Sequence, residues 1–161
     1  MAEVKIEGLA ELHTLLQELP ARIEANVLRG GMRAGAKVIE EEAKRLAPIG
    51  KDVQTAGELR DSIRISMRSR RGKVSATIKA GGKKAWYARL VEFGTAAHLI
   101  RPKNKKSLFF AALARTEVHH PGAKKKPFMR PALDSKAQQA VQTLAQYIRA
   151  RLPREFRKLG K

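Results

Sequence analysis

The sequence changes its hydrophobic period along the chain, and this change limits the possible folds more than any other feature. Near the C-terminus, apolar residues recur every three or four positions, as on one face of a helix: Leu133, Ala137, Val141, Leu144, Ile148 and Leu152. Between residues 63 and 80 they alternate with polar ones instead, as in half-buried strands. Helices and strands are segregated and do not alternate as βαβ units, which predicts the α+β class. We expect a small antiparallel sheet packed against a long helix and a C-terminal helix, with extended loops.

Two further helices are predicted before the strands. Residues 8–19 carry five leucines at helical spacing, and Pro20 stops this short amphipathic segment. A longer helix is expected over 21–46, again from apolar residues at three- and four-residue intervals. Three glycines lie inside it and each costs about 1 kcal/mol of helix propensity against alanine: Gly30, Gly31 and Gly35. Either the helix breaks there or another element packs closely against its backbone, and we favour close packing.

The strand region begins at Asp61 and is predicted to be a hairpin that turns at residues 70–72. A short helix is then expected from Trp86 to Phe93, with Gly94 as its C-terminal cap. The side chains predicted to face inward from this helix are Tyr87, Leu90 and Val91.

Further strands are predicted near 98–101 and 107–118, separated by a basic loop at 102–106. A proline-bounded basic segment, 121–131, is expected to lead into the last helix.

The length of 161 residues predicts one domain over 1–161. Mobile loops are expected at about 48–57, 101–107 and 121–131, and a basic C-terminal tail at 153–161. The N-terminus lacks the basic and apolar pattern of a signal peptide, and the apolar runs fall short of the roughly 20 residues of a spanning helix. We therefore expect a soluble intracellular product that does not enter membranes.

The chain carries 34 Lys and Arg against 15 Asp and Glu, which leaves a formal charge of +19. The excess lies in the second half, since residues 101–161 hold 16 basic and 3 acidic side chains. Such a gradient predicts an anionic neighbour, which the charge alone leaves open as nucleic acid, a membrane surface or an acidic protein. The residues expected to contact phosphates or an acidic partner are Lys103, Lys105, Lys106, Lys124, Lys125, Lys126 and Arg130.

Residues that could support catalysis are few. The chain has no cysteine, which excludes disulfides, thiolate nucleophiles and Cys-ligated metals. The adjacent His119 and His120 point to opposite faces of a strand, and His98 stands alone in the sequence. The run Glu40–Glu42 spreads around a helix and is best explained as a solvated face, while Glu92 is expected to pair with Arg89 or with a neighbouring subunit. We predict no enzymatic activity, no metal and no cofactor.

Three stretches of the chain carry a family resemblance: residues 57–63 (GELRDSI), 86–95 (WYARLVEFGT) and 120–133 (HPGAKKKPFMRPAL). Residues 100–110 (IRPKNKKSLFF) add to it. Taken in this order, they resemble the gp-ten-like family of tailed phages and prophages, whose members are neck, tail-completion (head–tail joining) or minor tail proteins.

The resemblance implies a non-enzymatic virion assembly protein that forms a homo-oligomeric ring, a hexamer, between connector and tail-tube proteins, with double-stranded DNA in its lumen. The protein would then be found in the host cytoplasm during assembly and afterwards in the neck or tail of the virion. The residues expected at a subunit or partner interface are Tyr87, Leu90, Glu92, Phe93, Gly94, Pro127, Phe128, Met129 and Pro131. Phe128 and Met129 have an alternative role as the apolar staple that seats the last helix. The alternative function is that of a sequence-independent, basic DNA-binding protein.

Overall fold

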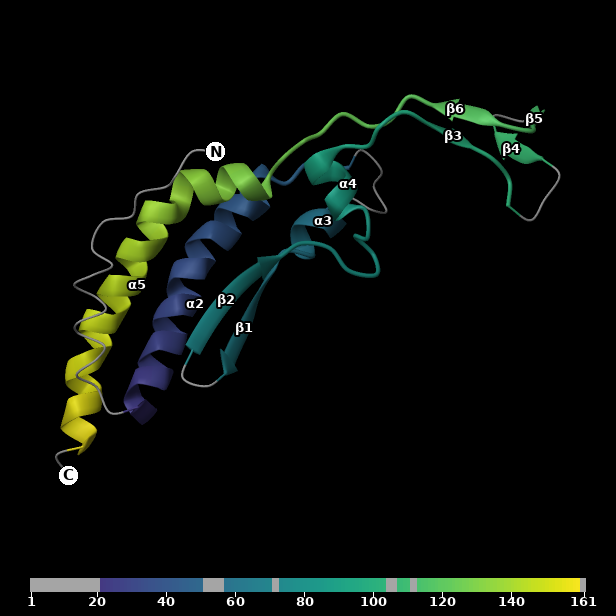
Figure 1. Ribbon diagram of the computed structural model, residues 1–161. Coiled ribbons are helices and arrows are strands. Elements are labelled where there is room, and N and C mark those ends of the chain that lie inside the picture. Colours follow the sequence, from purple (N-terminus) through teal and green to yellow (C-terminus); the bar gives the residue numbers. More distant parts are fainter. Residues whose placement is uncertain (1–20, 51–56, 71–72, 104–106, 111–112, 160–161) are drawn as a thin grey trace.

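The computed structural model describes residues 21–50, 57–70, 73–103, 107–110 and 113–159 (Figure 1). The segment predicted as a helix at 8–19 lies outside these residues, as does most of the loop expected at 48–57. The described elements are, in order, α2 (Ala21–Leu46), α3 (Glu58–Asp61), β1 (Arg64–Arg70), β2 (Lys73–Lys79), α4 (Ala88–Phe93), β3 (His98–Ile100), β4 (Leu108–Phe110), β5 (Leu113–Arg115), β6 (Val118–His120) and α5 (Met129–Leu159). The α+β class predicted from the sequence is confirmed.

Helices α2 and α5 lie side by side along most of their length and form the spine of the molecule (Figure 1). The glycines of α2 explain how they approach so closely. A Cβ on Gly35 would lie 2.7 Å from the carbonyl oxygen of Ala140, and one on Gly31 would lie 3.1 Å from the Ile148 side chain. A Cβ on Gly30 would overlap the ring of Tyr147. The predicted close packing against an unbroken helix is therefore confirmed.

Strands β1 and β2 form the predicted hairpin, paired from Arg64 opposite Lys79 to Arg70 opposite Lys73. The side chains of β2 alternate between half-buried and exposed, and both strands pack on α2. This alternation is what a two-stranded ribbon needs when only one of its faces meets a helix.

The main core lies where α2, α3, α4 and the start of α5 meet. Its buried members are mostly small residues, which lets the short helices pack closely: Ala43, Ala47, Leu59, Ile63, Ala85, Ala88, Phe128 and Ala132. A second cluster of Val27, Ile148 and Leu152 closes the other end of the α2–α5 pair. The sequence analysis missed α3, which is a single turn of four residues and shows no periodicity of its own.

Residues 95–123 form a long arm that projects away from this core (Figure 1). In it β3 pairs with β6, and β4 with β5, both antiparallel. The strand predicted over 107–118 is therefore wrong as one element, because two parts of it, β4 and β5, pair antiparallel with each other. The described strands form three two-stranded ribbons, and only the β1–β2 ribbon packs against the helices.

The bounds of α5 differ from the prediction at both ends. The helix starts at Met129, so Pro131, expected in the preceding segment, lies in its first turn, where proline is tolerated. At the other end it continues across Pro153 to Leu159, through residues expected as a basic tail. An ion pair of 3.0 Å between Arg151 and Glu155 spans the proline.

Replacing Gly35 by alanine tests the close packing of α2 and α5. Alanine normally stabilises a helix by about 1 kcal/mol relative to glycine, but here its Cβ would press on the backbone of Ala140. We expect Gly35→Ala to lower the free energy of unfolding by about 1–3 kcal/mol, measured by urea denaturation. Gly82→Ala is the control, since a Cβ there meets nothing within 4 Å. An unchanged or raised stability for Gly35→Ala would contradict the packing.

Candidate assembly interface

Helix α4 connects the arm to the core through its two buried residues, Ala88 and Glu92. They lie one turn apart and so share one face. Tyr87 and Val91 flank that face and pack against the core. The prediction that Leu90 points inward is wrong: Leu90 is 39% exposed, because a residue two positions from Ala88 and Glu92 projects from the opposite side of the helix.

The buried carboxylate of Glu92 caps the N-terminus of α5. Its oxygens accept hydrogen bonds from the backbone N–H groups of Phe128 at 2.7 Å, Met129 at 3.0 Å and Arg130 at 3.1 Å. The next residue, Pro131, has no N–H group, so the first turn of α5 leaves no donor without an acceptor. A negative charge at this end also interacts favourably with the helix dipole.

The side chain of Phe128 completes this contact from the apolar side. It is fully buried, at 0% exposure, in the core between α2, α3 and α4. Of the two roles considered for Phe128, the structure supports the staple that seats the last helix.

The two backbone strands of the arm are held together at its base, between α4 and α5. Thr95 and Ala123 exchange backbone hydrogen bonds of 3.0 and 3.1 Å, and the Thr95 hydroxyl accepts a further one from Ala123 N–H at 2.8 Å. Three residues before α5 begins, the backbone N–H of Lys126 donates a hydrogen bond to the carbonyl of Val91 at 2.8 Å. We call the contacts of Glu92, Thr95, Ala123, Lys126 and Phe128 the joint.

Two glycines allow the strands of the joint to come this close. Gly94 has φ 74° and Gly122 has φ 86°, a region that favours glycine. A Cβ on Gly94 would lie 2.7 Å from the carbonyl oxygen of Ala123, and one on Gly122 would overlap the carbonyl oxygen of Thr95. Gly94 ends α4 as predicted, and the second glycine serves the same approach from the returning strand.

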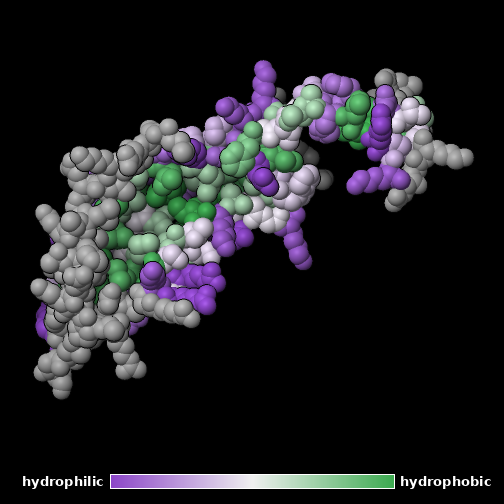
Figure 2. Space-filling view, in the orientation of Figure 1, coloured by the Kyte–Doolittle hydropathy of each residue, from purple (hydrophilic) through white to green (hydrophobic). Residues whose placement is uncertain are grey.

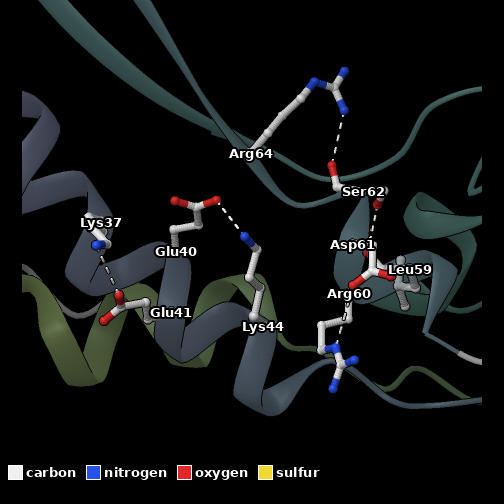
Figure 3. A network of polar contacts seen from close by, with 9 residues as sticks. All are labelled: Lys37, Glu40, Glu41, Lys44, Leu59, Arg60, Asp61, Ser62 and Arg64. Atoms are coloured by element: carbon white, nitrogen blue, oxygen red, sulfur yellow. Dashed lines mark hydrogen bonds and ion pairs between the residues drawn. The ribbon is translucent and has the colours of Figure 1, made fainter.

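The stretch 57–63 supports the joint from the other side of the core. Leu59 and Ile63 are buried beside Phe128. Ser62 donates from its hydroxyl to the Leu59 carbonyl at 2.6 Å, and Arg64 donates to the Ser62 carbonyl at 3.0 Å (Figure 3). The Ser62 hydroxyl also accepts a hydrogen bond from Gly81 N–H at 2.9 Å. These bonds tie α3 to the end of the β1–β2 ribbon, and with them all the stretches that carry the family resemblance, apart from 100–110, meet around one core.

The residues expected at a partner interface differ in how far the rest of the chain buries them. Glu92 and Phe128 are internal to the chain, and Tyr87, Gly94 and Met129 are partly buried. The exposed members are Leu90, Phe93, Pro127 and Pro131. Phe93 is 73% exposed, so within one copy of the chain its ring is largely in contact with solvent.

The basic residues singled out by the sequence lie on the surface wherever the structure describes them. Lys103 is exposed on the arm, and Lys124, Lys125 and Lys126 are exposed along the strand that returns from it. Arg130, on the first turn of α5, contacts Asp134 at 3.2 Å. Lys105 and Lys106 lie outside the described residues.

An apolar groove, which the sequence analysis missed, runs between α2, β2, α4 and α5. Its volume is about 820 Å³. The groove appears as the hydrophobic surface between these elements in Figure 2. Its lining includes Met32 and Ile39 from α2, Ala76 and Ile78 from β2, and Phe93 from α4. Leu133 and Val141 of the C-terminal stripe also line it, so that stripe faces the groove as well as α2. In the sequence, the signal for this groove was the apolar stripe of the C-terminal helix, which is too wide to be covered by one partner helix.

The titratable side chains considered for catalysis take part in local contacts. Glu40 pairs with Lys44 at 2.8 Å and Glu41 with Lys37 at 3.7 Å (Figure 3). Glu42 accepts from Arg45, and this hydrogen bond lowers the pKa of Glu42.

The rings of His98 and His120 stack across the β3–β6 ribbon with centroids 5.0 Å apart. Over the described ranges, no group of three or more His, Asp or Glu side chains is arranged to hold a metal ion. None of the described helices combines the length and apolar character needed to cross a membrane.

The fold and the joint therefore define a small α+β protein whose core holds a projecting β-arm. Comparison with known families gives this architecture a context. Residues 10–94 match the family model described as "Bacteriophage HK97-gp10, putative tail-component". The chain belongs to this family, so it is a bacteriophage tail component, with the virion tail as its location, and the resemblance inferred from the sequence is confirmed. No curated protein and no solved structure gives a significant match.

Removing the charge of Glu92 tests the cap. In Glu92→Gln one oxygen acceptor is lost and an amide N–H₂ group faces the N–H groups of α5. We expect the free energy of unfolding to fall by about 1–3 kcal/mol, measured by chemical denaturation followed by circular dichroism. The matched control is Glu117→Gln on the arm, an exposed carboxylate paired with Arg101, where the change should stay below about 1 kcal/mol. Equal effects of the two substitutions would contradict the special role of Glu92.

Proposed function

We propose that this tail component is a non-enzymatic ring protein of the head–tail connection, acting in the neck or in tail completion. The observation that carries the proposal is the arm, which is fixed to the core by the joint and projects beyond it (Figure 1). An element with few contacts to its own core is suited to contacts with other chains. Membership of a phage tail-component family supports a partner within the virion.

The mechanism follows from a fixed joint and a reaching arm. Glu92 and Phe128 set the direction in which the arm leaves the core, so each copy in a ring would present its arm in the same orientation. Six copies around an axis, the number implied by the resemblance, would make one surface patch contact a different patch on the next copy. Connector and tail-tube proteins would dock on the two faces of such a ring.

The basic surface supports two partners in this setting. Lys124, Lys125 and Lys126 are consecutive and exposed beside the joint. In a ring they would face either DNA passing through the lumen or acidic faces of the adjoining proteins. Direct binding of duplex DNA is the second candidate function, and the charge of the second half of the chain favours it.

Electron microscopy tests the ring. The purified chain is imaged alone and after mixing with tail tubes assembled from a tail-tube protein of the same phage. We expect rings, either free or seated on the ends of the tubes. The proposal would be contradicted if the chain forms no rings and binds neither tail tubes nor connector.

Charge reversal separates the two partners of the basic surface. We expect Lys124→Glu with Lys125→Glu and Lys126→Glu to weaken association with connector or tail tube more than about tenfold, because three cations leave one patch. A control with the same net charge reverses Lys79, Lys83 and Lys84, which are exposed on and after β2.

Electrophoretic shifts with duplex DNA across a salt series are measured on the same variants. A strong, salt-dependent shift that only the 124–126 variant loses would favour DNA as the partner. If the 124–126 variant and its control lose binding to DNA and to the partner proteins equally, a specific role of Lys124–Lys126 is contradicted.

A further inference from the structure

Among the residues that the structure describes, the apolar groove between α2, β2, α4 and α5 is open to the surface of a single copy of the chain. Small residues such as Gly35, Ala36 and Ala137 line it together with larger apolar side chains. Two of these larger side chains, Phe93 and Leu133, are 73% and 45% exposed. A mainly apolar recess of about 820 Å³ is suited to bind bulky hydrophobic side chains.

The arm has the complementary property. Its β3 strand exposes Leu99 and Ile100, and the three residues of β4 are Leu108, Phe109 and Phe110. A two-stranded ribbon is only marginally stable in water unless it packs on another layer. Within the described chain, the ribbons of the arm pack on neither helix of the spine.

The groove of the same copy is out of reach of this arm. The arm leaves the core at the end of α4 and extends away from the region where β2 faces α5 (Figure 1). Its base is pinned by the joint, and the positive φ of Gly94 and Gly122 belongs to that pinned geometry. The groove of a second copy of the chain can receive this arm without disturbing any of these contacts.

We propose that the arm of one copy packs the face of its β3–β6 ribbon that carries Leu99 into the α2–β2–α4–α5 groove of a second copy. The contact joins two different surfaces, so it repeats from copy to copy and closes into a ring when the rotation between copies permits. This inference rests on the proposed ring function and specifies its subunit contact. It also accounts for an exposed apolar arm and an empty apolar groove with a single interaction.

The absence of cysteine from the natural chain makes a direct test possible. One variant carries Leu99→Cys on the arm, and a second carries Ala76→Cys in the groove. The control carries Ser75→Cys, which lies next to Ala76 on β2 but on the exposed face of the strand. Equimolar mixtures are oxidised under conditions in which the unsubstituted chain assembles, and disulfide-linked heterodimers are quantified by non-reducing electrophoresis.

We expect the arm variant to form heterodimers with the Ala76→Cys chain more than about tenfold faster than with the Ser75→Cys chain, because docking raises the effective concentration of one pair only. The double variant Leu99→Cys with Ala76→Cys should give a ladder of oligomers. As a second measurement, Leu99→Asp should abolish self-association while leaving the melting temperature of the monomer unchanged.

The outcomes separate this inference from the function on which it rests. If rings form without preferential crosslinking of Leu99→Cys to Ala76→Cys, the proposed arm–groove contact is contradicted, but the proposed ring function is not. Absence of both rings and crosslinks would overturn both. In dilute monomer, a thiol reagent should modify Ala76→Cys readily; protection there would mean that residues 1–20 of the same chain fill the groove, and it would also overturn the inference.

Discussion

One carboxylate, that of Glu92, holds the architecture of this protein together. It is 9% exposed and accepts three backbone hydrogen bonds from the start of a helix 36 to 38 residues further along the chain. The segment between these two points is the arm, so the same contact that begins α5 also closes the base of the arm. A buried charge is tolerated here because three N–H groups and a helix dipole compensate it. Without this carboxylate, the end of α4 and the start of α5 would be held together mainly by the backbone hydrogen bonds between Thr95 and Ala123 and between Lys126 and Val91.

The position of Glu92 gives a physical meaning to three of the stretches in which the sequence resembles the family. Stretch 86–95 supplies the cap and the first glycine, and stretch 120–133 supplies the second glycine, the capped N–H groups and Phe128. Stretch 57–63 supplies Leu59 and Ile63, which pack against Phe128. These motifs therefore specify internal geometry. The parts of the chain that they hold in place, the arm and the groove, are where we propose that contacts with other chains are made.

Periodicity was enough to predict the long elements of the fold. The bounds of α2, the β1–β2 hairpin and the apolar stripe of α5 all follow from patterns that extend over many residues. The close packing at Gly35 was also predictable, because glycine lowers helix propensity and its presence inside a helix is explained when another element packs against the backbone. Short elements were harder to predict. Helix α3 has only four residues, and the apolar stretch predicted as a strand over 107–118 contains two strands that pair antiparallel with each other.

The site was harder to predict than the fold, since its central contact links residues far apart in the sequence. Nothing near Glu92 shows that its partners are N–H groups of Phe128, Met129 and Arg130. Proline at 131 was the available signal, because a residue without an N–H group fits the first turn of a helix. The groove was missed because its walls come from four separate elements, whereas the exposure of Lys124–Lys126 follows from their charge alone.

The central claim is that the core folds independently of the arm and that the arm serves assembly. Replacing residues 98–120 by a short glycine-serine linker, with Gly94, Thr95, Gly122 and Ala123 retained, tests it most directly. The measurement is cosedimentation of this chain and of the full chain with tail tubes, on samples shown by circular dichroism to be folded. We predict that the shortened chain melts cooperatively at a temperature close to that of the full chain and no longer assembles on the tubes. A folded, arm-less chain that assembles as well as the full chain would contradict the account.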